Sequence, residues 1–526
     1  MNHVEIAPAV YVNALPVDKF KTNYLSVSII HPLSAEAASN ASLLAFVLKR
    51  GSAAYPGIEA VNRRLEELYG ARFDVQIRKK GEAHIISFFM DFVDGRFIPG
   101  SPSLTEDAVT FLKEILFQPL LDGEAFRADI VDSEKRNLQD LLAARSNEKT
   151  SYAVHRCGEL MAKGQPFEVC EYGTRQEIEK ITPSSLFAFY KSALQSAVFE
   201  IFAIGAFSQQ RVAELMADAF ASDRRPVQVQ TTHIEPRGGV REYTESFQVE
   251  QAKLSLGYRL DADDVDFTAC TLFLILFGAS PHSMLFLNVR EKLSLCYYCS
   301  ARLDKLKRIM IVYSGVLPEN IGVAREEIDR QLEAVQRGEF SEQALAAAKY
   351  TYLNNLKSIA DSMYNLEDYA LTQNLLGLPT DLDAVIGQVE RMDRSAVQQA
   401  ARLLRRFQRN DRIAVAAGDR FRRFLLHGQP LAVGRHQRDR RLAGTQQHAG
   451  QNLAGIIGAD RIGDRSDHFL EFSLLDPDLP LRLELLRCRK IRGGQTEQRE
   501  MAGSAFQLDV VLVVDIEHDV GADKEI

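Results

Sequence analysis

The side chains best suited to metal or acid–base chemistry are scattered along this 526-residue chain. It has eleven histidines, and no two are three or four residues apart, as two ligands on one helix face would be. Glycine-rich phosphate loops, GxSxG elbows and HExxH motifs do not occur. Single histidines are therefore expected on the surface or lightly buried, among them His3, His31, His84, His155, His233 and His282.

The six cysteines are too few for a disulfide framework in so long a chain. Cys296 and Cys299 have a CxxC spacing, but the segment Leu295-Cys-Tyr-Tyr-Cys-Ser-Ala is typical of a strand. Residues three apart on a regular strand point to opposite faces, so these thiols are not expected to hold one metal ion. We expect them to be buried and reduced.

Composition excludes some classes of function. A hydrophobic share of 46% with 25% charged residues is typical of a globular protein. A net charge of −8 and a pI near 5.9 give no electrostatic reason to expect nucleic acid. The first 33 residues lack a secretory signal pattern, and the apolar runs are far shorter than the ~20 residues that cross a bilayer. We expect a soluble, cytoplasmic protein without a membrane partner.

The elements that must position any site fall into three stretches. Residues 1–224 read as strands near 9–12 and 24–30, helices over 35–49 and 57–69, a hairpin turning at 79–82, longer helices, and a strand over 199–204. Gly70 is suited to end the second helix.

Residues 225–426 repeat this order. A strand over 252–258 and a helix over 267–277 precede a helix that ends near Leu293, and strands follow. A weak repeat of about 200 residues favours two related α+β domains over a solenoid.

Residues 427–526 differ in character from the rest. The segments Arg435-His-Gln-Arg-Asp-Arg-Arg and Gly444-Thr-Gln-Gln-His-Ala-Gly-Gln have neither helical nor strand periodicity, and lysine is absent until Lys490. They are interpreted as an irregular tail, either disordered or derived from a frameshift.

Three segments carry patterns longer than a single motif. They are Arg50-Gly-Ser-Ala-Ala-Tyr-Pro through Leu65-Glu-Glu-Leu-Tyr-Gly, Tyr172-Gly-Thr-Arg-Gln-Glu-Ile-Glu-Lys-Ile-Thr-Pro, and Leu287-Asn-Val-Arg-Glu-Lys-Leu-Ser-Leu-Cys-Tyr. Together they resemble the insulinase-type (M16) metallopeptidases over most of residues 1–426. Asn147-Glu-Lys-Thr-Ser-Tyr-Ala and Arg156-Cys-Gly-Glu-Leu-Met further resemble its zinc-motif-lacking bacterial branch, called elongation factor P 5-aminopentanol modification-associated protein.

The resemblance implies an α+β fold of two homologous domains that form a clamshell. Each domain would hold an antiparallel-rich mixed sheet with helices packed on one face. The resemblance also locates a zinc site that has lost its chemistry. Aligned on Arg50-Gly51-Ser52, Ser42 and Phe46 stand at the histidine positions of HxxEH and Ala45 at the glutamate position. Glu134 matches the helix glutamate that anchors the third ligand, whose position seven residues on is Leu141.

Arg290 and Tyr297 match a second-half Arg/Tyr pair of the family. In active relatives this pair hydrogen-bonds the substrate carbonyl and the developing oxyanion. From the residues alone, a cap or ion pair at a helix end for Arg290 and a packed strand position for Tyr297 are favoured. With the resemblance, the structural and functional interpretations are equally open. Tyr298 would face the other way on a strand.

The resemblance thus implies a subunit that is inactive alone and holds no cofactor. It would bind peptide or unfolded polypeptide and give Arg290 and Tyr297 to a partner, a zinc-bearing M16 homologue, in a heterodimer. One alternative is a structural or assembly protein with no role in proteolysis. Another is an enzyme that uses a different site, although no cluster of ligands or nucleophiles in the sequence indicates one.

Overall fold

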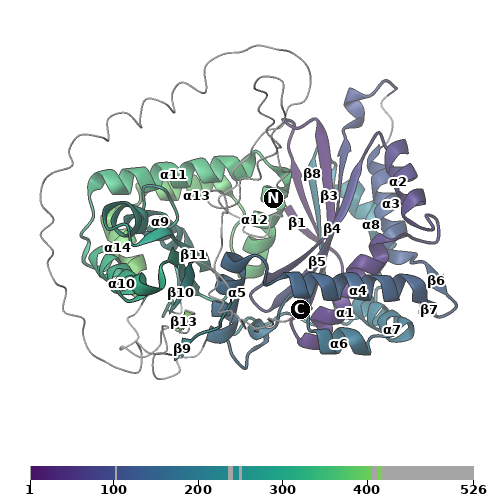
Figure 1. Ribbon diagram of the computed structural model, residues 1–526. Coiled ribbons are helices and arrows are strands. Elements are labelled where there is room, and N and C mark those ends of the chain that lie inside the picture. The colour runs from purple at the N-terminus through teal and green to yellow at the C-terminus, as the bar shows by residue number, and fades with distance from the viewer. Residues whose placement is uncertain are drawn as a thin grey trace, which may run out of the picture. The chain divides into compact units, whose positions relative to one another are not determined.

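The computed structural model describes residues 2–100, 104–234, 241–247, 251–262, 264–404 and 413–415 (Figure 1). Residues 427–526, for which the sequence predicts an irregular tail, lie outside the described residues. Most of the described residues belong to two β-sheets and the helices that pack on them.

The first sheet has six strands in the order β1-β2-β8-β3-β5-β4. Neighbouring strands are antiparallel except β2 and β8, which are parallel, so the sheet is mixed. The central strands β3, β5 and β8 are buried on both faces for most of their length, which explains their nearly continuous apolar sequences. The strands are β1 (Asn2–Ala7), β2 (Val10–Pro16), β3 (Thr22–Pro32), β4 (Arg72–Lys80), β5 (Ala83–Val93) and β8 (Val198–Gly205).

Helices and short turns connect and cover these strands (Figure 1). The helices are α1 (Ala35–Lys49), α2 (Ile58–Glu67), α3 (Leu104–Phe117), α4 (Ala128–Ala144), α5 (Lys149–Met161), α6 (Arg175–Lys180), α7 (Pro183–Ser196) and α8 (Gln209–Ala217). The short elements are the 3-10 turns η1 (Gly95–Phe97) and η2 (Pro166–Glu168) and a small ladder of β6 (Leu121–Asp122) and β7 (Ala125–Phe126).

Helix α1 has the limits that the sequence predicts, residues 35–49. The Ser34 side chain caps it by accepting a hydrogen bond from Ala37 N at 3.1 Å, and Lys49 stands in the last turn, where the helix dipole favours a cation. Residues 38–45 are all buried, so protein surrounds α1 on every side through this stretch.

The predicted hairpin across residues 79–82 is confirmed. Strands β4 and β5 pair from Arg72↔Asp91 to Lys80↔Ala83. This register, with that of β3, sets His84 opposite Lys79 on one side and His31 on the other.

The second sheet has five strands in the order β11-β12-β10-β13-β9. Its pairs are antiparallel except β13 and β9, which are parallel, so it is mixed like the first. The strands are β9 (Arg241–Tyr243), β10 (Ala252–Arg259), β11 (Cys296–Asp304), β12 (Ile309–Val316) and β13 (Ile413–Val415).

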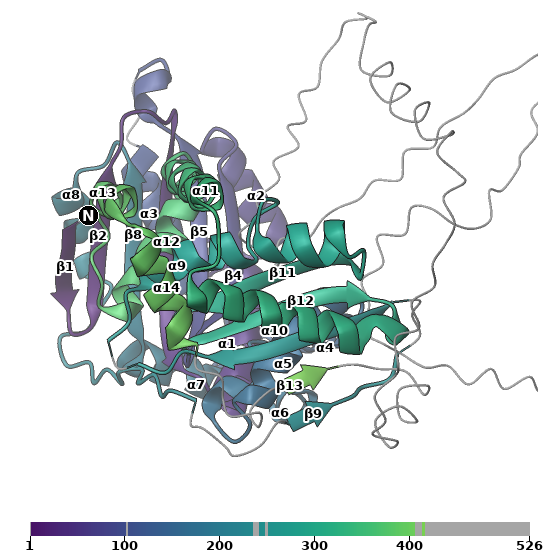
Figure 2. The same ribbon diagram turned by 90° about the vertical axis from the view of Figure 1, so that its left-hand side faces the viewer.

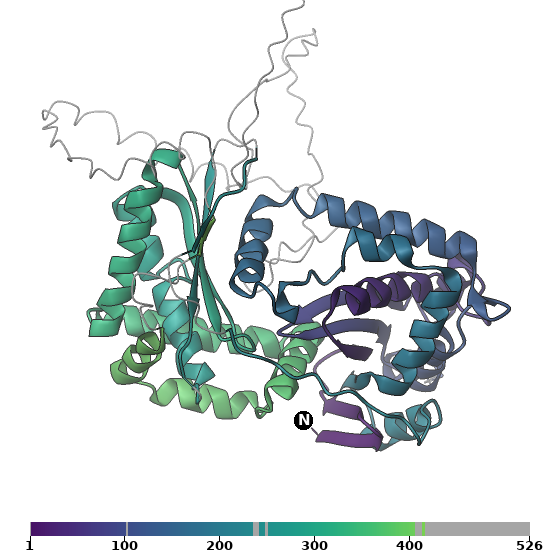
Figure 3. The same ribbon diagram turned by 90° about the horizontal axis from the view of Figure 1, so that it is seen from below.

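Most helices of the second half lie along one face of this sheet (Figures 2 and 3). The helices of this half, including α12, which packs elsewhere, are α9 (Phe267–Phe277), α10 (Ile321–Arg337), α11 (Glu342–Ala360), α12 (Met363–Leu376), α13 (Leu382–Arg391) and α14 (Arg394–Leu403), with the 3-10 turn η4 (Pro318–Asn320). The sequence predicts an ordinary helix ending near Leu293, but η3 (Phe286–Lys292) is a π-helix, whose wider turn changes where its side chains point.

Each half also contributes a helix to the other sheet. Val154 and Cys157 of α5 pack with Ile309 and Ile311 of β12. Helix α12 packs against the first sheet, where Leu366 lies in one apolar cluster with Tyr24 and Ile204. The second sheet is therefore covered on both faces, by α5 on one and by the α9 side on the other.

In the part of the chain that the structure describes, no helix combines the length and the apolar character needed to cross a bilayer.

Candidate functional site

Ser42 is buried inside α1, at the first of the predicted zinc-ligand positions. Its hydroxyl donates a hydrogen bond to the Glu171 carbonyl oxygen at 2.9 Å and lies 3.4 Å from His84 Nε2. The same carbonyl lies 2.7 Å from His84 Nε2. Since a carbonyl oxygen only accepts, His84 must carry its proton on Nε2. Ser42 and His84 thus fix the backbone of Glu171.

His84 and its cross-strand partner His31 are both buried, which corrects the prediction of surface or lightly buried positions. Burial lowers the pKa of His84 to about 4 and that of His31 to about 3. Both imidazoles are therefore neutral at pH 7. The sequence carried a signal for this, because each histidine adjoins two isoleucines near the end of a strand that lies in the interior of the sheet.

The segment after α5 passes close to α1 because of Gly173. This glycine has φ +76°, and a Cβ there would overlap the Ser39 side chain and lie 2.6 Å from Ser39 Cα. Thr174 N donates to Ser39 Oγ at 3.0 Å. Glycine is needed both for the left-handed backbone and for the close approach. This contact positions the Glu171 carbonyl oxygen next to the Ser42 hydroxyl.

The other three predicted positions carry apolar side chains. Ala45 lies in the core of the first sheet, and Phe46 is partly buried against it. Leu141 of α4 is 39% exposed. Glu134 is retained but forms an ion pair with Arg50 and accepts a hydrogen bond from Asn137 Nδ2 at 3.0 Å. Its carboxylate is thus held within the structure.

These residues do not fit a zinc ion. Zinc in proteins takes three or four nitrogen, sulfur or oxygen ligands, and these positions offer a hydrogen-bonded hydroxyl, a methyl group, a benzyl ring and an isobutyl group. Among the described residues, no group of three or more His, Cys, Asp or Glu side chains is arranged to hold a metal ion. These side chains therefore support no hydrolytic step that uses a metal ion.

A buried group of charges surrounds the Glu171 side chain. Burial by itself raises the pKa of this carboxyl, but Lys79, His155 and Arg145 together lower it. Lys79 Nζ also donates to the carbonyl oxygens of Val169 at 2.9 Å and Phe167 at 3.2 Å. No local sequence pattern predicts this cluster, because its members come from β4, α5 and the segments that follow α4 and α5.

Arg290 and Tyr297 lie at the edge of the second sheet. Arg290, on η3, has its guanidinium 4.5 Å from the centre of the Phe286 ring and its Nε 3.6 Å from Glu291 Oε1. Tyr297, on β11, is 61% exposed. No hydrogen bond joins the two among the residues that the structure describes, so each presents its donors separately.

A β-bulge in β11 determines the position and exposure of Tyr297. Cys296 is opposite Val316 of β12, but Tyr298 is opposite Gly315, so Tyr297 is the extra residue of the bulge. Tyr298 is mostly buried, and its hydroxyl lies 3.2 Å from Thr150 Oγ1 of α5. Tyr297 is therefore the exposed member of the two tyrosines.

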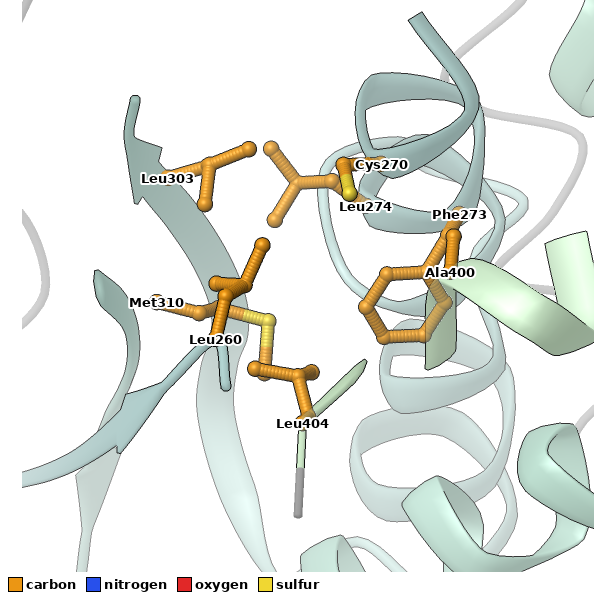
Figure 4. Close-up of a pocket in the computed structure, with 8 residues that line it drawn as sticks. All are labelled: Leu260, Cys270, Phe273, Leu274, Leu303, Met310, Ala400 and Leu404. Carbon is orange, nitrogen blue, oxygen red and sulfur yellow. The ribbon is translucent and has the colours of Figure 1, made fainter. Parts of the chain in front are cut away.

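Figure 4 shows a small cavity between α9 and the strands β11 and β12. Seven of its lining side chains are Leu, Met, Phe or Ala, and the eighth is Cys270. Burial raises the pKa of the Cys270 thiol to about 12, so it is unreactive at neutral pH. The lining has no group for polar recognition or acid–base chemistry, and we assign the cavity to packing.

Comparison with known proteins agrees with this site. Residues 180–352 match the family described as "Peptidase M16 inactive domain". The chain is 29% identical over 386 residues to the "Probable inactive metalloprotease YmfF" of Bacillus subtilis strain 168, covering 73% of this chain and 91% of that protein.

Several solved structures share the fold, three of them from two proteins. A conserved protein from Enterococcus faecalis V583 is 26% identical with a TM-score of 0.70, covering 79% of this chain and 98% of that chain. The periplasmic protease PqqL of Escherichia coli is 15% identical with a TM-score of 0.59, and the match covers 79% of this chain but 47% of PqqL. The match to the separately solved first half of PqqL covers 97% of that structure.

Fold and site together define the class as an M16 peptidase-like protein without a zinc site. The chain resembles M16 peptidases, and both the family model and the curated relative that it matches are described as inactive. The prediction that it is not an active peptidase on its own is supported. The narrower bacterial branch stays a prediction.

Proposed function

We propose that this chain is a non-catalytic M16 subunit that binds peptide and supplies Arg290 and Tyr297 to a zinc-bearing homologue. The observation that carries the proposal is the exposure of Tyr297 at the bulge of β11, beside a strand edge. A tyrosine kept only for packing would not need to present 61% of its surface to solvent.

The sheet edges favour binding of an extended peptide. Within the described residues, β11 pairs only with β12 and β4 only with β5, so each ends its sheet. A strand at a sheet edge has backbone N–H and C=O groups free for an added strand. A peptide on such an edge near Tyr297 would have its carbonyl oxygens within reach of phenol and guanidinium donors.

Division of the chemistry between two chains follows from what this one lacks. The partner would supply the zinc-activated water, and this chain would supply neutral and cationic donors for the oxyanion that forms as the water attacks. The length of PqqL supports a two-unit arrangement, because this chain matches about half of it. In the proposed pair, the second unit would be a separate chain.

The test is reconstitution with a zinc-bearing M16 homologue encoded in the same genome. We expect an unstructured reporter peptide to be cleaved by the pair and not by either chain alone. Arg290→Ala or Tyr297→Phe in this chain should lower kcat about 100-fold, the usual loss when one oxyanion donor is removed. Removal of zinc with a chelator should abolish the activity of the pair.

Matched substitutions control for general effects on folding. Arg175→Ala removes an exposed arginine that pairs with Glu179, and Tyr350→Phe removes an exposed hydroxyl on α11. Both variants should keep full activity in the pair. A partner that is fully active alone, or a pair unaffected by the Arg290 and Tyr297 changes, would instead indicate the alternative, an assembly protein with no role in proteolysis.

A further inference from the structure

The β-bulge at Tyr297 also brings two thiols to one face of β11. Cys296 is opposite Val316 and Cys299 is opposite Ser314, and these partners are two residues apart on β12. Residues two apart on a strand share a face, so Cys296 and Cys299 also share one. The prediction that they lie on opposite faces was wrong, because it holds only for a regular strand and β11 has a bulge between them.

The same register gives the spacing of the two cysteines. Their partners are separated by two strand steps, about 6.7 Å, and the Cα atoms of Cys296 and Cys299 must be separated by a similar amount. Disulfides span Cα distances up to about 6.8 Å. The pair therefore stands at the upper limit for a disulfide, and a small contraction of the bulge would join the two sulfur atoms.

The two thiols differ in access. Cys299 is buried, Cys296 is partly exposed, and both are free. A hydrogen bond from Cys299, with a further one from Ser314 and the charge of Arg290, lowers the pKa of Cys296 despite its burial, while the pKa of Cys299 is raised. Cys157, Cys170 and Cys270 contrast with Cys296, because burial raises the pKa of each to about 12.

We propose that Cys296 and Cys299 form a reversible disulfide by exchange with a small-molecule disulfide, and that this modification repositions Tyr297. The thiolate of Cys296 attacks one sulfur of the small disulfide and releases the other half as a thiolate. Cys299 then loses its proton, attacks the Cys296 sulfur and releases the second half. Two protein thiols are oxidised to one disulfide, and one small-molecule disulfide is reduced to two thiols.

Tyr297 responds because it lies inside the loop that the disulfide closes. Tyr297 is the extra residue of the bulge. A shorter distance between Cys296 and Cys299 must therefore change the backbone conformation of Tyr297. A link strained in this way is easily reduced, which suits a reversible modification. The effect on peptidase activity rests on the proposed function, whereas formation of the disulfide does not.

The experiment equilibrates the full chain with mixtures of oxidised and reduced glutathione and identifies linkages by peptide mass spectrometry. We expect a Cys296–Cys299 loop that dithiothreitol removes. In the Cys299→Ser variant, Cys296 should accumulate as a mixed disulfide with glutathione. The Cys296→Ser variant should react at least about tenfold more slowly, because Cys299 is buried and protonated. Circular dichroism melts confirm that both variants fold.

Three results would overturn the proposal: no loop under oxidising glutathione, a loop that uses another cysteine, or equal reactivity of the two variants. Hydrogen–deuterium exchange of the peptide that contains β11 should change on oxidation of the wild-type chain and not of Cys296→Ser, and an unchanged profile would refute the movement of Tyr297. If the loop forms and exchange changes but the reconstituted pair shows no peptidase activity, the proposed function fails and the thiol site stands.

Discussion

His84 is one of the buried imidazoles that link the stability of the chain to pH. Its hydrogen bond to the Glu171 carbonyl needs the neutral ring with a proton on Nε2, and burial lowers its pKa to about 4. An unfolded histidine has a pKa of about 6.5. The unfolded chain therefore binds more protons than the folded chain between these two values. The contribution of neutral His84 to the unfolding free energy is fully present above about pH 7. It is lost as the pH falls from 6.5 to 4.

We predict that His84 contributes about 2 kcal/mol to the fall in unfolding free energy between pH 7 and pH 5. A His84→Gln variant keeps an amide donor near the Glu171 carbonyl but takes up no proton, so its urea denaturation should show a fall smaller by that amount. His282 is exposed, and His282→Gln should leave the pH dependence unchanged. A His84→Gln variant with the wild-type pH dependence would show that this imidazole is not buried neutral.

Among the elements, the segment from Cys170 to Gly173 decides what α1 can do. It brings a backbone carbonyl to the position where the sequence alignment expects a metal ligand on the helix, and Ser42 and His84 both bond to that carbonyl. The close contact of Gly173 with Ser39 allows this approach.

Substitution of Gly173 by alanine should therefore be severe. An alanine at this position would have to adopt an unfavourable left-handed backbone conformation, and its Cβ would overlap Ser39. We therefore expect a loss of about 3 kcal/mol or more in unfolding free energy. Gly123 has a similar φ of +60°, but open space surrounds its Cβ position, so Gly123→Ala should cost only about 1 kcal/mol. Equal losses in chemical denaturation would mean that the backbone conformation alone, and not the contact with α1, requires Gly173.

At the scale of the molecule, one buried ion-pair network joins the first sheet to α12. Arg78 donates to both carboxylate oxygens of Glu367, at 2.9 and 3.0 Å, and to Asp368 at 2.8 Å. Glu367 is completely buried, and Ser87 Oγ accepts a further bond from Arg78 at 2.7 Å. Removing one partner of such a pair leaves a buried charge without its counter-charge.

Glu367→Gln should lower the unfolding free energy by about 3 kcal/mol at pH 7, as measured by urea denaturation. The matched change Glu179→Gln removes one partner of the exposed Arg175–Glu179 pair and should change stability by no more than about 0.5 kcal/mol. If the two variants lose the same stability, solvent screens the Arg78–Glu367 pair and it does not hold α12 to the sheet.

Signals that are local in the chain could be predicted correctly. The limits of α1 and α9, the β4–β5 hairpin and the central strands depend on caps, turns and apolar runs within a few residues. The absence of zinc-binding side chains at Ser42, Ala45, Phe46 and Leu141 is likewise a matter of residue type. Arg290 and Tyr297 were named by resemblance, and their role stays a prediction.

Contacts between distant parts of the sequence could not be predicted. The extra residue at Tyr297 exists only relative to β12, and that register turns two cysteines expected on opposite faces into neighbours. The burial of His84, the contact of Gly173 with α1 and the pairing of Arg78 with Glu367 likewise depend on segments brought together by folding. The sequence by itself determined which chemistry α1 cannot perform. Only the tertiary structure decided what those residues do in its place, because burial, pKa and register are properties of neighbours in space.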